Sequence, residues 1–251
     1  MSGAGTLPRL VVLPTDDLPA AAAAEIARIL AAAVAARGTA HWATTGGSAA
    51  PGIYAALREA PLRDGLDWSR IHTWWGDDRF VPANHPLSNV MPIAGMPIPD
   101  ANLHPMLAGE AIALGESPGW AAARYASELA ALVPADADGT PVLDLMILGV
   151  GPDGHFLSVF PGSAVWDEPL LVCAVPAPTH IEPHVARVTM HPRLVAAARA
   201  VLVIAAGGSK AANLGRAWTG DDVRELPVRA ARIGTATWFL DEAAAAELPR
   251  G

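Results

Sequence analysis

Cysteine, positive charge and charge in general are scarce in this chain of 251 residues. Cys173 is the one cysteine, so no disulfide can form within the chain, and its place in the apolar run 170–175 indicates a buried thiol. Charged residues make up 17% and hydrophobic residues 52%, a balance that supplies a large core and argues against disorder. The formal net charge of −8 disfavours a nucleic-acid partner. A small anion could still bind, provided that local cations and helix N-termini hold it.

Signals for secretion and for membrane insertion are also missing. The first residues show no basic stretch followed by an apolar one, so we expect no signal peptide and a cytoplasmic location. The apolar stretch 20–36 contains Glu25 and Arg28 and predicts a helix of the protein core, with no role at a membrane.

Short β-type runs alternate with helical ones along the rest of the chain. We expect one α/β domain over residues 1–251, with a mostly parallel, Rossmann-like sheet covered by helices on both faces. The expected strands are 9–13, 41–45, 70–75, 143–149, 170–175, 200–205 and 235–240; the expected helices are 18–36, 51–59, 118–132, 209–218 and a closing helix 241–248 capped by Asp241. Residues 81–115 are rich in proline and asparagine and predict a loop with short helices.

Active sites of open α/β sheets lie at the carboxyl ends of strands, and three such ends carry polar or glycine-rich motifs. After the strand 41–45, Gly46, Gly47 and Ser48 precede a helix that begins near Pro51. Free N–H groups at the start of a helix suit a phosphate, although the same residues are also typical of an ordinary tight turn. No lysine follows the glycines, so the motif is not a P-loop.

The second motif follows the strand 70–75 and contains Asp77, Asp78 and Arg79. Arg79 could grip a phosphate with two N–H groups, and a carboxylate could orient a hydroxyl or move a proton. A solvated acidic turn with a local ion pair is the alternative interpretation.

The third motif, residues 149–155, fits the pattern G-x-G-x-x-G but does not suit a dinucleotide. Asp153 places a negative charge where a pyrophosphate would lie, Pro152 removes a backbone N–H, and no acid ends the next predicted strand. We expect instead a site loop in which His155 acts as a general base and Asp153 orients its ring.

Together and in this order, the motifs resemble the 6-phosphogluconolactonase family. The matching segments are 46–48, 75–82 with His85 and 88–89, 144–155 with Ser158 and 160–162, 187–189, 207–210 and 238–241. The sequence departs from the family pattern at Ala49 and Ala50, at Asp78, and at Phe156 and Leu157, which bears on substrate fit more than on chemistry.

The resemblance implies hydrolysis of 6-phospho-D-glucono-1,5-lactone without metal or organic cofactor, and the fold of glucosamine-6-phosphate deaminases. It implies that His155 activates water, that Asp77 and Asp153 shape the site, and that cations hold the phosphate. The residues implied to contact substrate or its phosphate are Gly46, Gly47, Ser48, Arg79, Arg187 and Lys210. The sequence is compatible with a monomer and with a homodimer.

Three other functions compete with the lactonase. Amino-sugar-phosphate deaminases resemble the chain at the same acids, but they carry a glutamate five residues after the histidine, where this chain has Phe160. A non-catalytic sugar-phosphate sensor of the same fold would usually bring a DNA-binding module, for which we see no segment before the first strand. A metal site at His180 and His184 is disfavoured because Pro183 lies between them.

Overall fold

A seven-stranded sheet forms the centre of the protein, whose computed structural model describes residues 7–48 and 50–249. The strand order is β1-β10-β9-β6-β2-β3-β5, and every neighbouring pair in it is parallel. The strands are β1 (Arg9–Leu13), β2 (Ala40–Thr44), β3 (Ile71–Trp75), β5 (Leu103–His104), β6 (Leu145–Gly149), β9 (Val201–Ala205) and β10 (Ala236–Asp241). β2 and β9 are buried along their whole length, as expected of strands covered on both faces.

Helices and single turns connect these strands. The α-helices are α1 (Leu18–Arg37), α2 (Ala50–Leu57), α3 (Ala108–Leu114), α4 (Pro118–Leu132), α5 (Pro192–Ala197) and α6 (Ala211–Thr219). The 3₁₀ turns are η1 (Trp68–Arg70), η2 (Met91–Ile93), η3 (Asp100–Asn102), η4 (Ala164–Asp167), η5 (Gly208–Lys210) and η6 (Pro227–Ala231). α4 begins as its sequence predicts, because Ser117 accepts a hydrogen bond from the Trp120 N–H and proline occupies the first turn.

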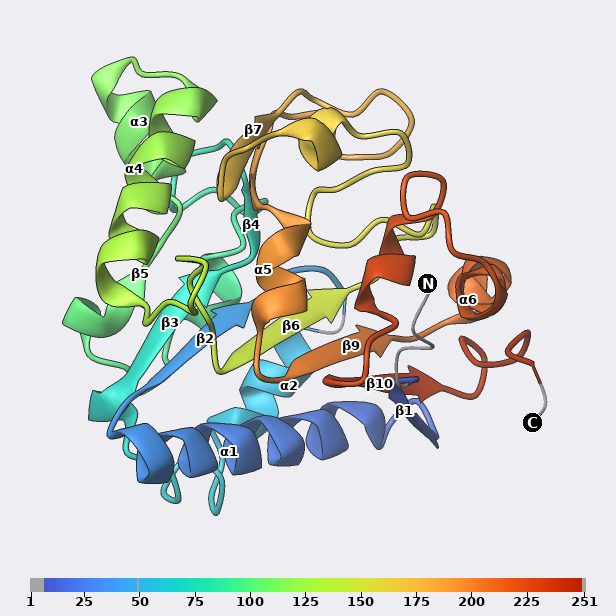
Figure 1. Ribbon diagram of the computed structural model, residues 1–251. Helices are drawn as coiled ribbons and strands as arrows, with labels where there is room; N and C mark the ends of the chain where they lie inside the picture. The colour runs from blue at the N-terminus through green and yellow to red at the C-terminus, as the bar shows by residue number, and fades with distance from the viewer. Residues whose placement is uncertain (1–6, 49, 250–251) are drawn as a thin grey trace.

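Helix α1 is long and apolar enough to cross a membrane by length and composition. It packs instead against α2, β2, β6 and β10, and it buries side chains that include Ala22, Ile26 and Leu30. Figure 1 shows it running along the sheet. These contacts are those of a core helix, as the sequence predicted.

The order of the strands places a switch point between β2 and β6. From β2 the chain adds β3 and β5 on one side, and from β6 it adds β9 and β10 on the other. Loops that leave neighbouring strands in opposite directions open a crevice at the carboxyl edge of the sheet. The glycine turn after β2 and the loop after β6 meet there, and the Gly149 N–H lies 3.3 Å from Thr45 Oγ1.

A second, antiparallel sheet was not expected from the sequence. It contains β4 (Asp77–Arg79), β8 (Arg187–Met190) and β7 (Val172–Val175), in that order. The run 170–175 was predicted to join the main series of strands, but it belongs to this sheet and begins at Val172. β4 was not predicted because its three residues are all polar and show no hydrophobic periodicity.

One predicted helical segment is wrong. Residues 242–247 form successive turns, and Asp241 is the last residue of β10. Pro249 disfavours helical backbone at the residue before it. Residues 156–159 form a tight turn closed by a Val159 N–H to Phe156 O bond of 3.0 Å, in which Leu157 has a positive φ of 52° that a helix does not accept.

Candidate active site

The turn after β2 is held in shape by its neighbours. The buried Tyr54 hydroxyl of α2 accepts a hydrogen bond from the Thr45 N–H at 3.1 Å and donates one to the Thr45 carbonyl at 2.7 Å. A Cβ at Gly46 would lie 1.9 Å from Asn89 Oδ1, so no other residue fits there without moving Asn89. Ser48 follows on the cavity wall, and residue 49, where the chain departs from the family pattern, lies outside the described residues.

The two acids of β4 face different partners because adjacent side chains of a strand alternate. Asp77 lines the cavity, and its Oδ2 accepts a 2.6 Å hydrogen bond from the Ser158 hydroxyl. Asp78 is turned away and accepts bonds from the N–H groups of Asn89 and Arg79 at 2.6 and 2.8 Å. Burial raises the pKa of Asp78 to about 6, although these hydrogen bonds oppose the shift. Asp78 therefore holds the backbone of Arg79 and Asn89 in place, whereas Asp77 faces the cavity and is available to a ligand.

His155 and Asp153 form a close pair on the loop after β6. Asp153 Oδ1 lies 2.5 Å from His155 Nδ1 and 3.2 Å from the His155 backbone nitrogen. Burial opposes ionisation of Asp153, but hydrogen bonds from His155 and His180 outweigh it and hold the pKa of the carboxyl well below its usual range. An ionised Asp153 keeps the ring proton on Nδ1 and leaves Nε2 of His155 as the acceptor, which is the tautomer that a general base requires.

Gly151 is required by this pair rather than by a dinucleotide. A Cβ at Gly151 would lie 2.1 Å from Nδ1 and Cε1 of His155 and 2.8 Å from Asp153 Oδ1. The loop is closed by a Gly151 N–H to His155 O bond of 2.9 Å. The glycine pattern thus allows the imidazole to fold back over its own loop.

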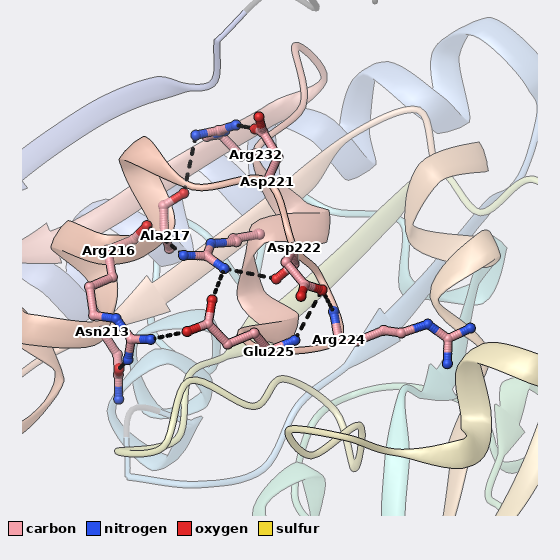
Figure 2. A network of polar contacts seen from close by, with 9 residues as sticks. Asn213, Arg216, Ala217, Asp221, Asp222, Arg224, Glu225 and Arg232 are labelled. Atoms are coloured by element: carbon pink, nitrogen blue, oxygen red, sulfur yellow. Dashed lines mark hydrogen bonds and ion pairs between the residues drawn. The ribbon is translucent and has the colours of Figure 1, made fainter.

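The segment from α6 to η6 supports the outer side of this loop. The Asn213 amide donates to the Pro152 carbonyl at 2.7 Å, and the Val228 N–H donates to the Gly154 carbonyl at 3.0 Å. Figure 2 shows the polar network behind these contacts, in which Arg216 bonds both Asn213 and Glu225. The network joins α6 to residues 221–232, so both anchors of the loop belong to one cross-linked unit.

Three cations line the cavity without a carboxylate within 4.0 Å in the part of the chain that the structure describes. Arg79 on β4 and Arg187 on β8 stand opposite each other in the antiparallel register, and Lys210 ends η5. Burial lowers the pKa of both Arg187 and Lys210. Arg79 Nε is buried and has no hydrogen-bond partner among the described residues. An anion beside Arg79 and Arg187 would offset the repulsion between them and satisfy the free N–H of Arg79.

The cavity itself has a volume of about 310 Å³. Its wall contains eight of the nine residues expected from the sequence: Gly46, Gly47, Ser48, Asp77, Arg79, His155, Arg187 and Lys210. Asp153 is the exception and contacts His155 from outside the wall. The sequence motifs therefore meet in one place, while the role of each residue stays a prediction.

No group of three or more His, Cys, Asp or Glu side chains suited to a metal ion occurs in residues 7–48 and 50–249. His180 and His184, considered above as metal ligands, have carboxylate neighbours of their own. His180 contacts Asp153 with its Nε2 at 2.9 Å from Oδ2. Sequence reasoning missed this contact because no local spacing relates residues on separate loops.

Comparison with known proteins agrees with this geometry and confirms the resemblance seen in the motifs. The 6-phosphogluconolactonase of Streptomyces coelicolor is 38% identical over 97% of this chain and 95% of its own length. The solved 6-phosphogluconolactonase of Trypanosoma cruzi superposes with a TM-score of 0.86 at 26% identity, covering 99% of this chain and all of that one.

A monomeric glucosamine-6-phosphate deaminase shares the fold, with a TM-score of 0.77 at 18% identity over 95% of this chain and 99% of its own. The model of the family described as glucosamine-6-phosphate isomerases/6-phosphogluconolactonase matches residues 14–239, which include every residue of the cavity wall. The chain belongs to this family of glucosamine-6-phosphate isomerases and 6-phosphogluconolactonases.

Proposed function

We propose that the protein hydrolyses 6-phospho-D-glucono-1,5-lactone to 6-phospho-D-gluconate. The observation that carries the proposal is one cavity whose wall contains His155, held from behind by Asp153, together with the cations Arg79, Arg187 and Lys210. A base beside an anion site suits a substrate that carries a phosphate at one end and a hydrolysable ester at the other. The Streptomyces coelicolor relative is named for this activity.

His155 would act first as base and then as acid. Its Nε2 takes a proton from water while the water oxygen attacks C1 of the lactone, and the carbonyl oxygen becomes an oxyanion. Collapse of this intermediate breaks the bond between C1 and the ring oxygen, which takes the proton back from His155. Asp153 stabilises the imidazolium between the two steps through its 2.5 Å contact. General-base assistance of this kind is typically worth about 10²–10⁴-fold.

Arg79, Arg187 and Lys210 would bind the phosphate, while Gly46, Gly47 and Ser48 line the path of the sugar. Asp77, fixed by Ser158, would orient a sugar hydroxyl. Binding energy from the remote phosphate then holds C1 close to the water, which lowers the entropic part of the barrier. The proposal needs no metal and no organic cofactor.

Phe160 argues against deamination of an amino-sugar phosphate. Its ring lies 4.8 Å from the ring of His155, at the position where the related deaminases carry a glutamate. A phenyl ring cannot move a proton to or from a sugar ring oxygen, so the histidine has no acid partner for ring opening there. Water attack on an activated ester requires no such partner.

The test is the loss of 6-phosphogluconolactone, generated in place from glucose 6-phosphate and its dehydrogenase and corrected for spontaneous hydrolysis. We expect His155→Ala to lower kcat by about 10²–10⁴-fold, because it removes the base. His184→Ala is the matched control, since among the described residues the exposed Glu182 is the one ion-pair partner of its imidazole. We expect Arg79→Gln to raise KM more than it lowers kcat, because it acts on the phosphate.

Rapid hydrolysis by the His155→Ala variant would refute the assignment of the base. No acceleration by the folded wild type would refute the lactonase, and glucosamine 6-phosphate would then be the next substrate to assay. A cytoplasmic location and a monomeric or homodimeric state stay predictions of the sequence.

A further inference from the structure

His180 lies on a separate loop, between β7 and β8, and contacts the proposed catalytic pair of Asp153 and His155. Its Nε2 lies 2.9 Å from Oδ2 of Asp153, while Oδ1 of the same carboxylate lies 2.5 Å from Nδ1 of His155. Within the described chain, the bond from His180 is the one hydrogen bond that joins residues 176–186 to residues 149–162. The two histidines therefore share one carboxylate, one on each oxygen.

A second contact fixes the ring of His180. It stands edge-on to Phe160, with centroids 5.6 Å apart and an interplanar angle of 89°, and the same Phe160 ring lies 4.8 Å from His155. The His180 side chain is 49% exposed, so water can reach it, but Phe160 and Asp153 together define where the ring lies. A freely solvated surface histidine would have neither contact.

We propose that His180 is a positioning residue of the catalytic pair, and this rests on the proposed role of His155 as base. The Nε2–H of His180 holds one oxygen of Asp153, so that the other stays directed at His155 Nδ1. It also draws charge from the carboxylate, so that His155 is deprotonated, and able to accept a proton from water, down to a lower pH.

The direction follows from charge sharing. A carboxylate that accepts hydrogen bonds on both oxygens stabilises an imidazolium less than one with a free oxygen. Loss of the His180 donor would leave the charge of Asp153 to His155 alone and favour the protonated ring. Other charged groups reach the same cavity from other elements, and they are unchanged in the variants proposed below: Asp77 and Arg79 on β4, Arg187 on β8, Lys210 on η5, and Glu182 on the loop.

The proposal is tested with His180→Phe, which keeps a ring against Phe160 and removes the donor, and with His180→Gln, which keeps an amide donor at a similar reach. The readouts are the NMR titration of the His155 ring, assigned with His155→Ala, and the pH profile of kcat/KM for the lactone. We expect His180→Phe to raise both midpoints by roughly half a pH unit, which is about a threefold loss of kcat/KM on the acid limb. His180→Gln should titrate like the wild type, and KM should change little because the cations are intact.

His184→Phe is the control on the same loop, and it should leave both midpoints in place. Unshifted midpoints in His180→Phe, or an equal shift in His184→Phe, would overturn the role of His180. Should the phenylalanine variant fail to fold, His180→Ala at this half-exposed position gives the same comparison. The NMR titration does not depend on turnover, so an inactive enzyme or an active His155→Ala variant would count against the proposed function and not against the contact.

Discussion

Replacing Gly151 with alanine tests the architecture of the catalytic loop most directly. The added methyl would lie 2.1 Å from two atoms of the His155 ring, whereas ordinary contact begins near 3.4 Å. The ring must therefore retreat by about 1.3 Å, and its 2.5 Å bond to Asp153 cannot survive that movement. A displacement of about 1 Å at a catalytic group costs about 10²-fold in rate.

We therefore expect Gly151→Ala to lower kcat for lactone hydrolysis by about 10²-fold. KM should stay within a small factor of the wild-type value, because Arg79 and Lys210 are not displaced. The assay is the coupled lactone assay with background correction, read together with thermal unfolding, where overpacking should cost about 1–3 kcal/mol. Gly119→Ala is the matched control, because its nearest recorded neighbour, Ser117 Oγ, lies 3.6 Å from the new Cβ.

A Gly151→Ala variant with nearly wild-type kcat would refute this reasoning. It would mean that the imidazole has room to move without losing its function, and hence that the contact with Asp153 does not limit catalysis. A parallel loss of activity in Gly119→Ala would show instead that any added methyl harms the fold.

Two further predictions concern stability. Ser158→Ala removes the 2.6 Å hydrogen bond to the buried Asp77. We therefore expect it to lower the free energy of unfolding, measured by urea titration, by about 1.5–3 kcal/mol. Ser127→Ala, on the exposed face of α4, is the control and should stay near the wild-type value. Burial and neighbouring histidines lower the pKa of His41 to about 4, so its contribution to stability is complete above pH 6.5 and is lost as the pH falls towards 4. The urea midpoint should drop between pH 7 and pH 5, and His41→Asn, which can still accept from Trp74, should drop less; an equal drop in both proteins would contradict this assignment.

The parallel sheet could be predicted because its strands are short apolar runs separated by helical segments. β2 and β6 illustrate this, since both are almost fully buried and both end in glycine-rich turns. The order of the strands is harder to predict from the sequence. Ligands of open sheets nevertheless bind where the connections of neighbouring strands diverge, so motifs at strand ends could be expected to meet. The structure brings the wall residues of all three motifs into one cavity.

The antiparallel sheet and the His180 contact could not be predicted in the same way. Arg79 and Arg187 become neighbours through a pairing of β4 with β8, and three polar residues give no periodic signal for such a strand. His180 reaches Asp153 from a loop 27 residues along the chain, where only tertiary packing brings them together. The closing segment 241–248 shows the opposite failure, because a favourable cap and an alanine run predict a helix where the chain forms turns ahead of Pro249.

The pairing of Arg79 with Arg187 would allow a protein with a net charge of −8 to bind the anionic substrate that we propose. Backbone register fixes the two guanidinium groups on facing strands, and burial of Arg187 prevents full solvation of its charge. Arg79 repels the Arg187 guanidinium, and a phosphate beside the two groups would offset this repulsion. Affinity gained in this way is local and depends little on the charge of the distant surface, which salt screens over about 8–10 Å. Binding energy released at the proposed phosphate site would then be available to hold the lactone carbon beside His155.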